Sequence, residues 1–132
     1  MTVRILIADD HKMMRQALRA LLSSDTGITV VAEAGDGEEA LAKAAETRPD
    51  IVLMDVSMPN MNGIEATQQL VGRQLGVKVI GLSAYPDRRF VDGMLEAGAV
   101  GYITKSEAGE ELFRAIRAVM AGQIYLCPMV SS

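Results

Sequence analysis

Ionisable and polar side chains stand at the ends of four of the chain's five short apolar runs. The residues concerned are Asp9 and Asp10 after the first run, Asp55 after the third, Ser83 after the fourth and Lys105 after the fifth. If these run ends are neighbours in space, three carboxylates meet at one place and repel one another unless a cation holds them. Mg²⁺ takes oxygen ligands of this kind and commonly acts beside phosphate. The set therefore indicates magnesium-dependent phosphoryl transfer.

Position, rather than residue type, separates the three carboxylates. Asp9 and Asp10 are adjacent and suit the holding of a metal ion, whereas Asp55 stands alone at the end of the central run. Because carboxylates form aspartyl-phosphates, Asp55 is the better candidate acceptor. Ser83 and Lys105 offer a hydroxyl and an ammonium group to the phosphoryl oxygens. Taken singly each residue has an ordinary role, such as a helix cap for Asp9 or Asp10, so the hypothesis depends on their convergence.

The elements that must position these residues follow from the hydrophobic pattern. The apolar runs are Val3 to Ala8, Ile28 to Ala32, Ile51 to Met54, Val77 to Leu82, and Val100 to Ile103. Short, nearly continuous runs are typical of parallel strands covered on both faces. Between the runs, apolar residues recur at helical spacing, and Asp36 with Glu39 has the spacing of a helix cap. The pattern predicts an α/β fold with βα repeated five times around a parallel sheet.

The composition of the 132-residue chain bounds its class. Hydrophobic residues make up 49% and charged residues 23%, as expected of one ordered domain with its own core. The net charge of −4 gives this segment no electrostatic footprint for nucleic acid. No apolar run approaches the ~20 residues of a membrane helix and no signal-peptide pattern is present, so we expect a cytoplasmic protein that contacts no membrane. The single cysteine, Cys127, is assigned no role.

Several segments together carry a family likeness. They are the Asp9-Asp10 pair, Asp55 within Leu-Met-Asp-Val-Ser-Met-Pro-Asn-Met-Asn-Gly, Ser83-Ala84, and Tyr102-Ile103-Thr104-Lys105. In these segments the chain resembles the response-regulator receiver domains of bacterial two-component signalling, over about residues 3–122. The opening Ile-Leu-Ile-Ala-Asp-Asp-His and the closing Ala-Gly-Gln-Ile-Tyr-Leu-Cys-Pro are most similar to the NarL/FixJ subgroup. The resemblance implies a flavodoxin-like (βα)5 doubly wound parallel sheet with strand order 2-1-3-4-5.

The resemblance also implies a phosphoacceptor and a cofactor. Asp55 would accept a phosphoryl group from the phosphohistidine of a sensor histidine kinase. Mg²⁺ would be bound directly by Asp10, Asp55 and the main-chain carbonyl of Ser57, and by Asp9 mainly through water. His11 is interpreted as a first-turn residue, because hard Mg²⁺ prefers oxygen to imidazole nitrogen. Such a chain is a signalling domain, not an enzyme, and catalyses only its own phosphorylation and dephosphorylation.

A conformational switch follows from the same resemblance. Ser83 and Lys105 would bind the phosphoryl oxygens, the Ser83 hydroxyl would move toward the phosphate, and the ring of Tyr102 would turn inward. The face made by the fourth helix, fifth strand and fifth helix would change as a result. The alternative for Tyr102 is a plain half-buried strand aromatic. Many receivers have a cis bond before proline after the lysine; Ser106 stands there in this chain, and the isomer of the Lys105–Ser106 bond stays open.

The domain boundaries are predicted from the same comparison of patterns. Residues 1–122 would form the receiver domain, and residues 123–132 the start of a linker. In the NarL/FixJ subgroup such a linker leads to a helix-turn-helix DNA-binding domain, which this segment lacks. The resemblance thus implies transcription control through an output domain outside this chain, DNA contacts only there, and a homodimer on phosphorylation. The alternative is a stand-alone receiver acting in a phosphorelay or in protein–protein signalling.

The residues of two loops argue against other classes of protein that share features of this pattern. A haloacid-dehalogenase-type phosphatase needs a second acid two residues after the nucleophile, where this chain has Ser57. A flavodoxin-like flavin binder needs a Gly-, Ser- or Thr-rich loop after the first strand, where this chain has Asp9-Asp10-His11. An acidic loop repels phosphate unless a metal intervenes. A receiver-like interaction module that never takes phosphate is a third alternative, disfavoured by the complete set of five residues.

Overall fold

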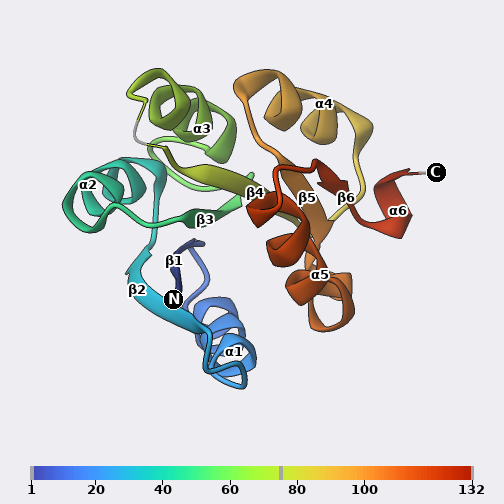
Figure 1. Cartoon of the computed structure of the whole chain (residues 1–132). Coiled ribbons are helices and arrows are strands. Elements are labelled where there is room, and N and C mark those ends of the chain that lie inside the picture. Colours follow the sequence, from blue (N-terminus) through green and yellow to red (C-terminus); the bar gives the residue numbers. More distant parts are fainter. Residues whose placement is uncertain (1, 75, 132) are drawn as a thin grey trace.

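The computed structural model describes residues 2–74 and 76–131, and it shows helices packed on both faces of a central sheet (Figure 1). The strands are β1 (Val3–Ala8), β2 (Ile28–Ala34), β3 (Ile51–Asp55), β4 (Lys78–Ser83), β5 (Gly101–Thr104) and β6 (Tyr125–Leu126). The helices are α1 (Lys12–Leu22), α2 (Gly37–Thr47), α3 (Gly63–Gly72), α4 (Arg88–Ala97), α5 (Ala108–Met120) and α6 (Pro128–Ser131), with a 3-10 turn η1 (Lys105–Glu107). Within the described ranges, no helix has the length and apolar character needed to cross a membrane.

The six strands are all parallel, in the order β2-β1-β3-β4-β5-β6. The first five reproduce the expected order 2-1-3-4-5, so the flavodoxin-like α/β fold class is confirmed. The direction in which strands are added reverses between the neighbouring strands β1 and β3. The chain passes from β1 to β2 on one side and then returns to add β3 on the other side of β1. The sixth strand, beside β5, was not predicted.

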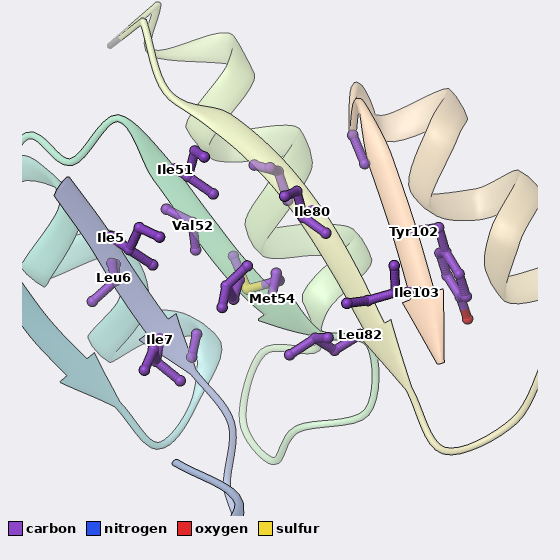
Figure 2. Close-up of a cluster of buried hydrophobic side chains, with 14 of the residues drawn as sticks. Ile5, Leu6, Ile7, Ile51, Val52, Met54, Ile80, Leu82, Tyr102 and Ile103 are labelled. Carbon is purple, nitrogen blue, oxygen red and sulfur yellow. The ribbon is translucent and has the colours of Figure 1, made fainter. Parts of the chain in front are cut away.

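The core explains why the strands read as continuous apolar runs. Helices α2, α3 and α4 cover one face of the sheet, and α1 and α5 cover the other (Figure 1). Every residue of β3 is buried as a result. Figure 2 shows the aliphatic side chains of β1, β3 and β4 packed together, among them Ile5, Val52 and Leu82. A strand buried on both faces cannot alternate apolar and polar residues. The continuous apolar runs in the sequence therefore correctly indicated strands covered on both faces.

Local polar residues fix where the helices begin and end. The Glu39 amide donates to Asp36 Oδ1 at 2.8 Å, which confirms the predicted cap of α2. Asn62 caps α3 in the same way, through the amide of Glu65 at 2.9 Å. Helix α4 is capped at its C-terminus by Gly98, whose φ of +111° is a left-handed conformation that glycine adopts without strain. These caps set the lengths of the loops that follow β2 and β3 and of the loop that precedes β5.

Residues 123–131, called here the C-terminal segment, fold back onto the domain. β6 pairs Tyr125 with Gly101 and Leu126 with Tyr102 of β5. The Cys127 amide then donates to the Tyr102 carbonyl at 3.1 Å, and the Cys127 side chain is fully buried. Cys127, to which no role was given from the sequence, is therefore a core residue.

Candidate functional site

Each polar residue of the site is positioned by the end of a strand. β1 leads into Asp9, β3 ends at Asp55, β4 ends at Ser83, and Lys105 follows β5 directly. Because β1, β3, β4 and β5 are successive neighbours and run in the same direction, their carboxyl ends bring these residues to one edge. Both β3 and β4 extend one residue further than the apolar runs, so Asp55 and Ser83 are strand residues held by the ladder rather than loop residues.

Lys105 pairs with two buried carboxylates. Its Nζ atom lies 2.8 Å from Asp9 Oδ2 and 3.2 Å from Asp55 Oδ2. The Lys105 side chain is 17% exposed, whereas the Asp9 side chain is fully buried and that of Asp55 is 4% exposed. Buried charges of this kind persist only when they are paired, because water no longer solvates them. The Lys105 ammonium therefore holds together two carboxylates that would otherwise repel each other.

The balance of charge still disfavours the ionised form of Asp55. Burial, together with the neighbouring Asp9 charge, raises the pKa of the Asp55 carboxyl group to about 6. The Lys105 ammonium and the Ser57 amide act in the opposite direction without cancelling this shift. For Lys105, burial works against the ammonium, but the carboxylates outweigh it and raise its pKa. A divalent cation beside Asp55 would favour the carboxylate and lower the Asp55 pKa.

A cluster of acidic groups surrounds the same point. One ligand atom from each of Asp9, Asp10, His11 and Asp55 lies within 4.8 Å of the others. The Asp10 side chain is 31% exposed and faces solvent beside the buried Asp9. Three carboxylates with one of them open to solvent suit a hard cation that keeps part of its water, as Mg²⁺ does. The oxygen-rich donor set therefore fits the predicted metal.

His11 is closer to the cluster than the sequence reasoning assumed. It is the N-cap of α1 and not a residue of the first turn, and its side chain makes no capping hydrogen bond, so neither Asp9 nor Asp10 is the N-cap residue considered above. Asp9 Oδ1 instead accepts a hydrogen bond from the His11 amide at 2.8 Å. The His11 Nδ1 atom lies 3.1 Å from Asp9 Oδ1 and 3.1 Å from Asp10 Oδ1. The position of His11 directly after two acids in the sequence could have indicated that it lies close to the cluster. Its imidazole also lines the pocket beside Asp55.

The loop between β3 and α3 folds tightly against Asp55. The Ser57 amide donates to Asp55 Oδ1 at 3.2 Å, and the Gly63 amide donates to the Val56 carbonyl at 2.9 Å. A Cβ atom at Gly63 would lie 2.2 Å from the Asp55 carbonyl oxygen, so α3 can start this close to the strand end only because residue 63 is glycine. Ser57 is exposed beside the cluster. That its carbonyl binds the metal stays a prediction.

A pocket of about 290 Å³ opens beside Asp55. It is lined by His11, Asp55, Ser57, Ser83, Ala84, Tyr85, Phe90 and Lys105. The Ser83 side chain is nearly buried, and its hydroxyl accepts a hydrogen bond from the Tyr85 amide at 3.1 Å. A group attached to Asp55 would therefore share its pocket with the Ser83 hydroxyl and the Lys105 ammonium, two donors to a phosphoryl oxygen.

The ring of Tyr102 lies inside the protein. Tyr102 is fully buried on β5 (Figure 2), so the alternative of a half-buried strand aromatic is not what the structure shows. A Cβ atom at Gly81 would lie 3.0 Å from the Tyr102 ring and 3.1 Å from Met94 Cε, so glycine makes room for both. The hydroxyl makes no hydrogen bond with the described residues, and burial raises the Tyr102 pKa. The switching role stays a prediction.

The backbone after Lys105 settles the open question of isomer. Among the residues that the structure describes, no peptide bond is cis, so the Lys105–Ser106 bond is trans. Lys105 begins the η1 turn, and Thr104 Oγ1 donates to Glu107 Oε1 at 3.1 Å within it. The turn places the Lys105 side chain over the strand ends without the cis bond found in many receivers.

Comparison with known protein families identifies relatives over nearly the whole chain. A family model described as the response regulator receiver domain matches residues 5–117. Response regulator GacA of Pseudomonas viridiflava is 41% identical over 129 residues, which are 98% of this chain and 60% of GacA. Response regulator UvrY of Escherichia coli (strain K12) is 38% identical over 124 residues, 94% of this chain and 57% of UvrY. The chain thus spans about three fifths of the length of these relatives.

Solved structures agree with the sequence comparison. The crystal structure of a two-component response regulator of the LuxR family from Aurantimonas sp. SI85-9A1 superposes with a TM-score of 0.94 at 38% identity, covering 99% of this chain and 94% of that one. The signal receiver domain of the putative response regulator NarL from Mycobacterium tuberculosis gives a TM-score of 0.88 at 30% identity, covering 92% and 98%.

Proposed function

Because this chain belongs to the response regulator receiver domain family, we propose that it accepts a phosphoryl group on Asp55 from the phosphohistidine of a sensor histidine kinase. One observation carries the proposal: Asp55 is a buried carboxylate at a strand end, 3.2 Å from the Lys105 ammonium and in one pocket with the Ser83 hydroxyl. An acid with a purely structural role does not require an open pocket lined by an ammonium group and a hydroxyl group, so this arrangement supports a chemical role for Asp55. The activity is that of a signalling domain whose only reactions are its own phosphorylation and dephosphorylation.

The transfer needs few groups from the protein. A carboxylate oxygen of Asp55 forms a bond to phosphorus while the phosphorus–nitrogen bond of phosphohistidine breaks, and the electron pair leaves with the imidazole. Lys105 exchanges its contact with Asp55 for one with a phosphoryl oxygen and keeps its ion pair with Asp9. The Ser83 hydroxyl donates to another phosphoryl oxygen. Positioning and charge stabilisation of this kind supply most of the catalysis in phosphoryl transfer.

Mg²⁺ is the proposed cofactor. Asp10, Asp55 and the Ser57 carbonyl would hold it, and Asp9 would contribute mainly through water. When bound, it neutralises the negative charge that the carboxylates and the phosphoryl group bring together. Support comes from the cluster of acidic groups within 4.8 Å and from the raised Asp55 pKa, since both indicate an excess of negative charge that a cation would relieve.

The proposed response to phosphorylation runs through Ser83 and Tyr102. Ser83 is the last residue of β4, and the Tyr102 ring packs over Gly81 of the same strand. A shift of Ser83 toward the phosphoryl group would therefore move the strand end against which the ring is packed. We propose that this repacking changes the face formed by α4, β5 and α5, so that phosphorylation becomes a change in surface shape.

The whole protein is proposed to regulate transcription. The chain covers only 55% of the transcriptional regulatory protein DegU of Brevibacillus brevis, to which it is 37% identical, so that relative contains a further region beyond the receiver. We propose that residues 1–122 are the receiver and that residues 123–132 begin a linker to a DNA-binding output domain. A cytoplasmic location and a homodimer on phosphorylation belong to the same proposal. A stand-alone receiver in a phosphorelay is the alternative, and the full reading frame decides between them.

Intact-mass measurement tests the central proposal. The chain is incubated with acetyl phosphate and Mg²⁺, and we expect a mass increase of one phosphoryl group. Asp55→Asn should abolish the increase, and chelation of Mg²⁺ should strongly reduce it. Glu46→Gln, which removes an exposed carboxylate on α2, is the matched control and should label like the native chain. Undiminished labelling of Asp55→Asn would refute Asp55 as the acceptor.

A further inference from the structure

The C-terminal segment occupies the face that the proposed switch would change. β6 lies beside β5, and α6 lies near the start of α4 (Figure 1). Two of its side chains, Cys127 and Val130, are buried in the domain core. The segment is therefore a packed layer over β5 and not a free tail.

Two anchors of different kinds hold this segment. Its first half is fixed to α5, because the Tyr125 hydroxyl donates to the carboxylate of Glu111, a residue that is only 4% exposed. Its second half contacts α4 and β5: Arg88 Nη1 donates to the Val130 carbonyl at 3.1 Å, and the Cys127 amide donates to Tyr102. Both halves pair with β5, but the side-chain anchor of the first half is on α5 and that of the second half is on α4.

The neighbours of the second half are joined directly to the residues proposed to bind phosphate. Arg88 begins α4 at the far end of the short loop that starts at Ser83. Thr104, whose Oγ1 lies 3.7 Å from Met129 Sδ, immediately precedes Lys105. Among the described residues, the hydrogen bond between Tyr125 and Glu111 involves neither stretch. Movement of Ser83 and Lys105 onto a phosphoryl group would thus act first on the second half, whereas the first half keeps its separate anchor on α5.

We propose that phosphorylation of Asp55 releases residues 127–131 from β5 and α4 while Tyr125 stays anchored to α5. This inference rests on the proposed phosphoacceptor function. The loop after Ser83 is drawn toward Asp55, which withdraws Arg88 from the Val130 carbonyl. A short stretch held by two buried side chains and a few hydrogen bonds opens locally at far less cost than the whole domain unfolds, so a modest bias shifts its population.

Cys127 provides the test, because it is the chain's only cysteine and is fully buried while the segment is docked. The full chain is treated with acetyl phosphate and Mg²⁺, its phosphorylation is followed by intact mass, and the reaction of Cys127 with a thiol reagent is timed. We expect the thiol rate to rise about tenfold on phosphorylation, as a population shift of about 1.4 kcal/mol would produce. Hydrogen exchange should rise at residues 127–131 and stay unchanged in β3.

The outcomes separate the two proposals. A chain that gains the phosphoryl mass but keeps its thiol rate, or lowers it, overturns the release and leaves the phosphoacceptor function intact. A chain that gains no mass overturns both. An equal rise in hydrogen exchange in β3 would show general destabilisation and would also overturn the release.

A pair of adjacent arginines supplies matched variants. Arg88→Ala removes the donor to the Val130 carbonyl, so the thiol rate of the unphosphorylated chain should already be raised and phosphorylation should add little. Arg89→Ala removes a side chain that is 88% exposed and pairs with Asp87, so its thiol rate and its response to phosphorylation should match the native chain. An Arg88→Ala chain that behaves like Arg89→Ala would overturn the proposed route through α4.

Discussion

The ammonium of Lys105 lies 2.8 Å from the fully buried carboxylate of Asp9, although β3 and β4 separate the strands that carry the two residues. A cation from the end of β5 therefore neutralises an acid from the end of β1, over the top of the intervening strands. In the absence of a metal ion, the charge balance of the site therefore depends on Lys105. Removal of the Lys105 charge should change the stability of the domain measurably.

Replacement of Lys105 by methionine keeps most of the apolar stem and removes the charge. Asp9 and Asp55 are then buried without a cation, and loss of one partner from a buried ion pair costs about 3–5 kcal/mol. We expect the free energy of urea unfolding in EDTA at neutral pH to fall by about that amount. Lys12→Met, at an exposed position on α1, is the control and should change it little. Equal stability of the two variants would show that Lys105 is not needed to balance the acids.

The raised Asp55 pKa predicts a specific pH dependence of stability in the absence of Mg²⁺. Its folded value of about 6 exceeds the ordinary 3.8, so the protonated acid is favoured by folding. The contribution is full below pH 3.8 and is lost as pH rises through about 6, and it amounts to about 3 kcal/mol at most. Asp55→Asn cannot ionise, so the native chain should lose stability relative to this variant between pH 4 and pH 7. A constant difference between their urea unfolding free energies would contradict the shift.

Mg²⁺ should reverse this loss by binding the ionised cluster. A ligand at one hundred times its dissociation constant stabilises the folded state by about 2.7 kcal/mol, which raises the melting temperature measurably. We expect Mg²⁺ to raise the melting temperature of the native chain and of Glu46→Gln, but not of Asp10→Asn. An undiminished Mg²⁺ effect in Asp10→Asn would place the ion elsewhere.

Two glycines of α3 provide a contrast within one helix. A Cβ atom at Gly63 would lie 2.2 Å from the Asp55 carbonyl oxygen, so Gly63→Ala should displace the start of α3 and cost at least about 2 kcal/mol. At Gly72 a Cβ atom would meet nothing within 4 Å, so Gly72→Ala should stabilise by about 0.5–1 kcal/mol through helix propensity. Urea unfolding measures both. A mild effect at Gly63 would mean that the loop after Asp55 adapts.

The two buried or half-buried tyrosine hydroxyls should respond oppositely to removal. Tyr102 carries a hydroxyl without a hydrogen-bond partner among the described residues, so Tyr102→Phe should raise the unfolding free energy by about 1 kcal/mol. The Tyr125 hydroxyl is bonded to the buried Glu111, so Tyr125→Phe should lower it by about 1–3 kcal/mol. A loss of stability in Tyr102→Phe would show that its hydroxyl is hydrogen-bonded in solution.

Much of the fold was predictable because burial and topology leave direct marks on a sequence. β3 reads as Ile-Val-Leu-Met because both of its faces are covered, and Asp36 caps α2 through a contact only three residues away. The meeting of Asp9, Asp55, Ser83 and Lys105 followed from parallel strands, whose carboxyl ends share one edge, together with the strand order 2-1-3-4-5 that the family resemblance implied. Which residues lie together could thus be predicted, whereas the roles given to them remain proposals.

The parts that could not be predicted depend on packing between distant residues. β6 contains only Tyr125 and Leu126, too few for any periodicity, and its place is set by β5 and by Glu111 of α5. The apolar residues from Ile124 to Cys127, after Gly122, were the local sequence feature that could have indicated this strand. Full burial of Tyr102 depends on the absence of a side chain at Gly81, a relationship across two strands that no local pattern contains.

The parallel direction of β6 would have a geometric consequence for any module that followed this segment. An antiparallel sixth strand would have carried the backbone toward the amino-terminal ends of the strands, on the opposite side of the molecule from Asp55. Instead the backbone passes Tyr102 and reaches Arg88 and Thr104 beside the phosphoacceptor edge. A module tethered at that exit point would be held at high effective concentration beside the pocket of Asp55, where the proposed kinase would bind. The kinase and the tethered module would then compete for the same edge of the sheet.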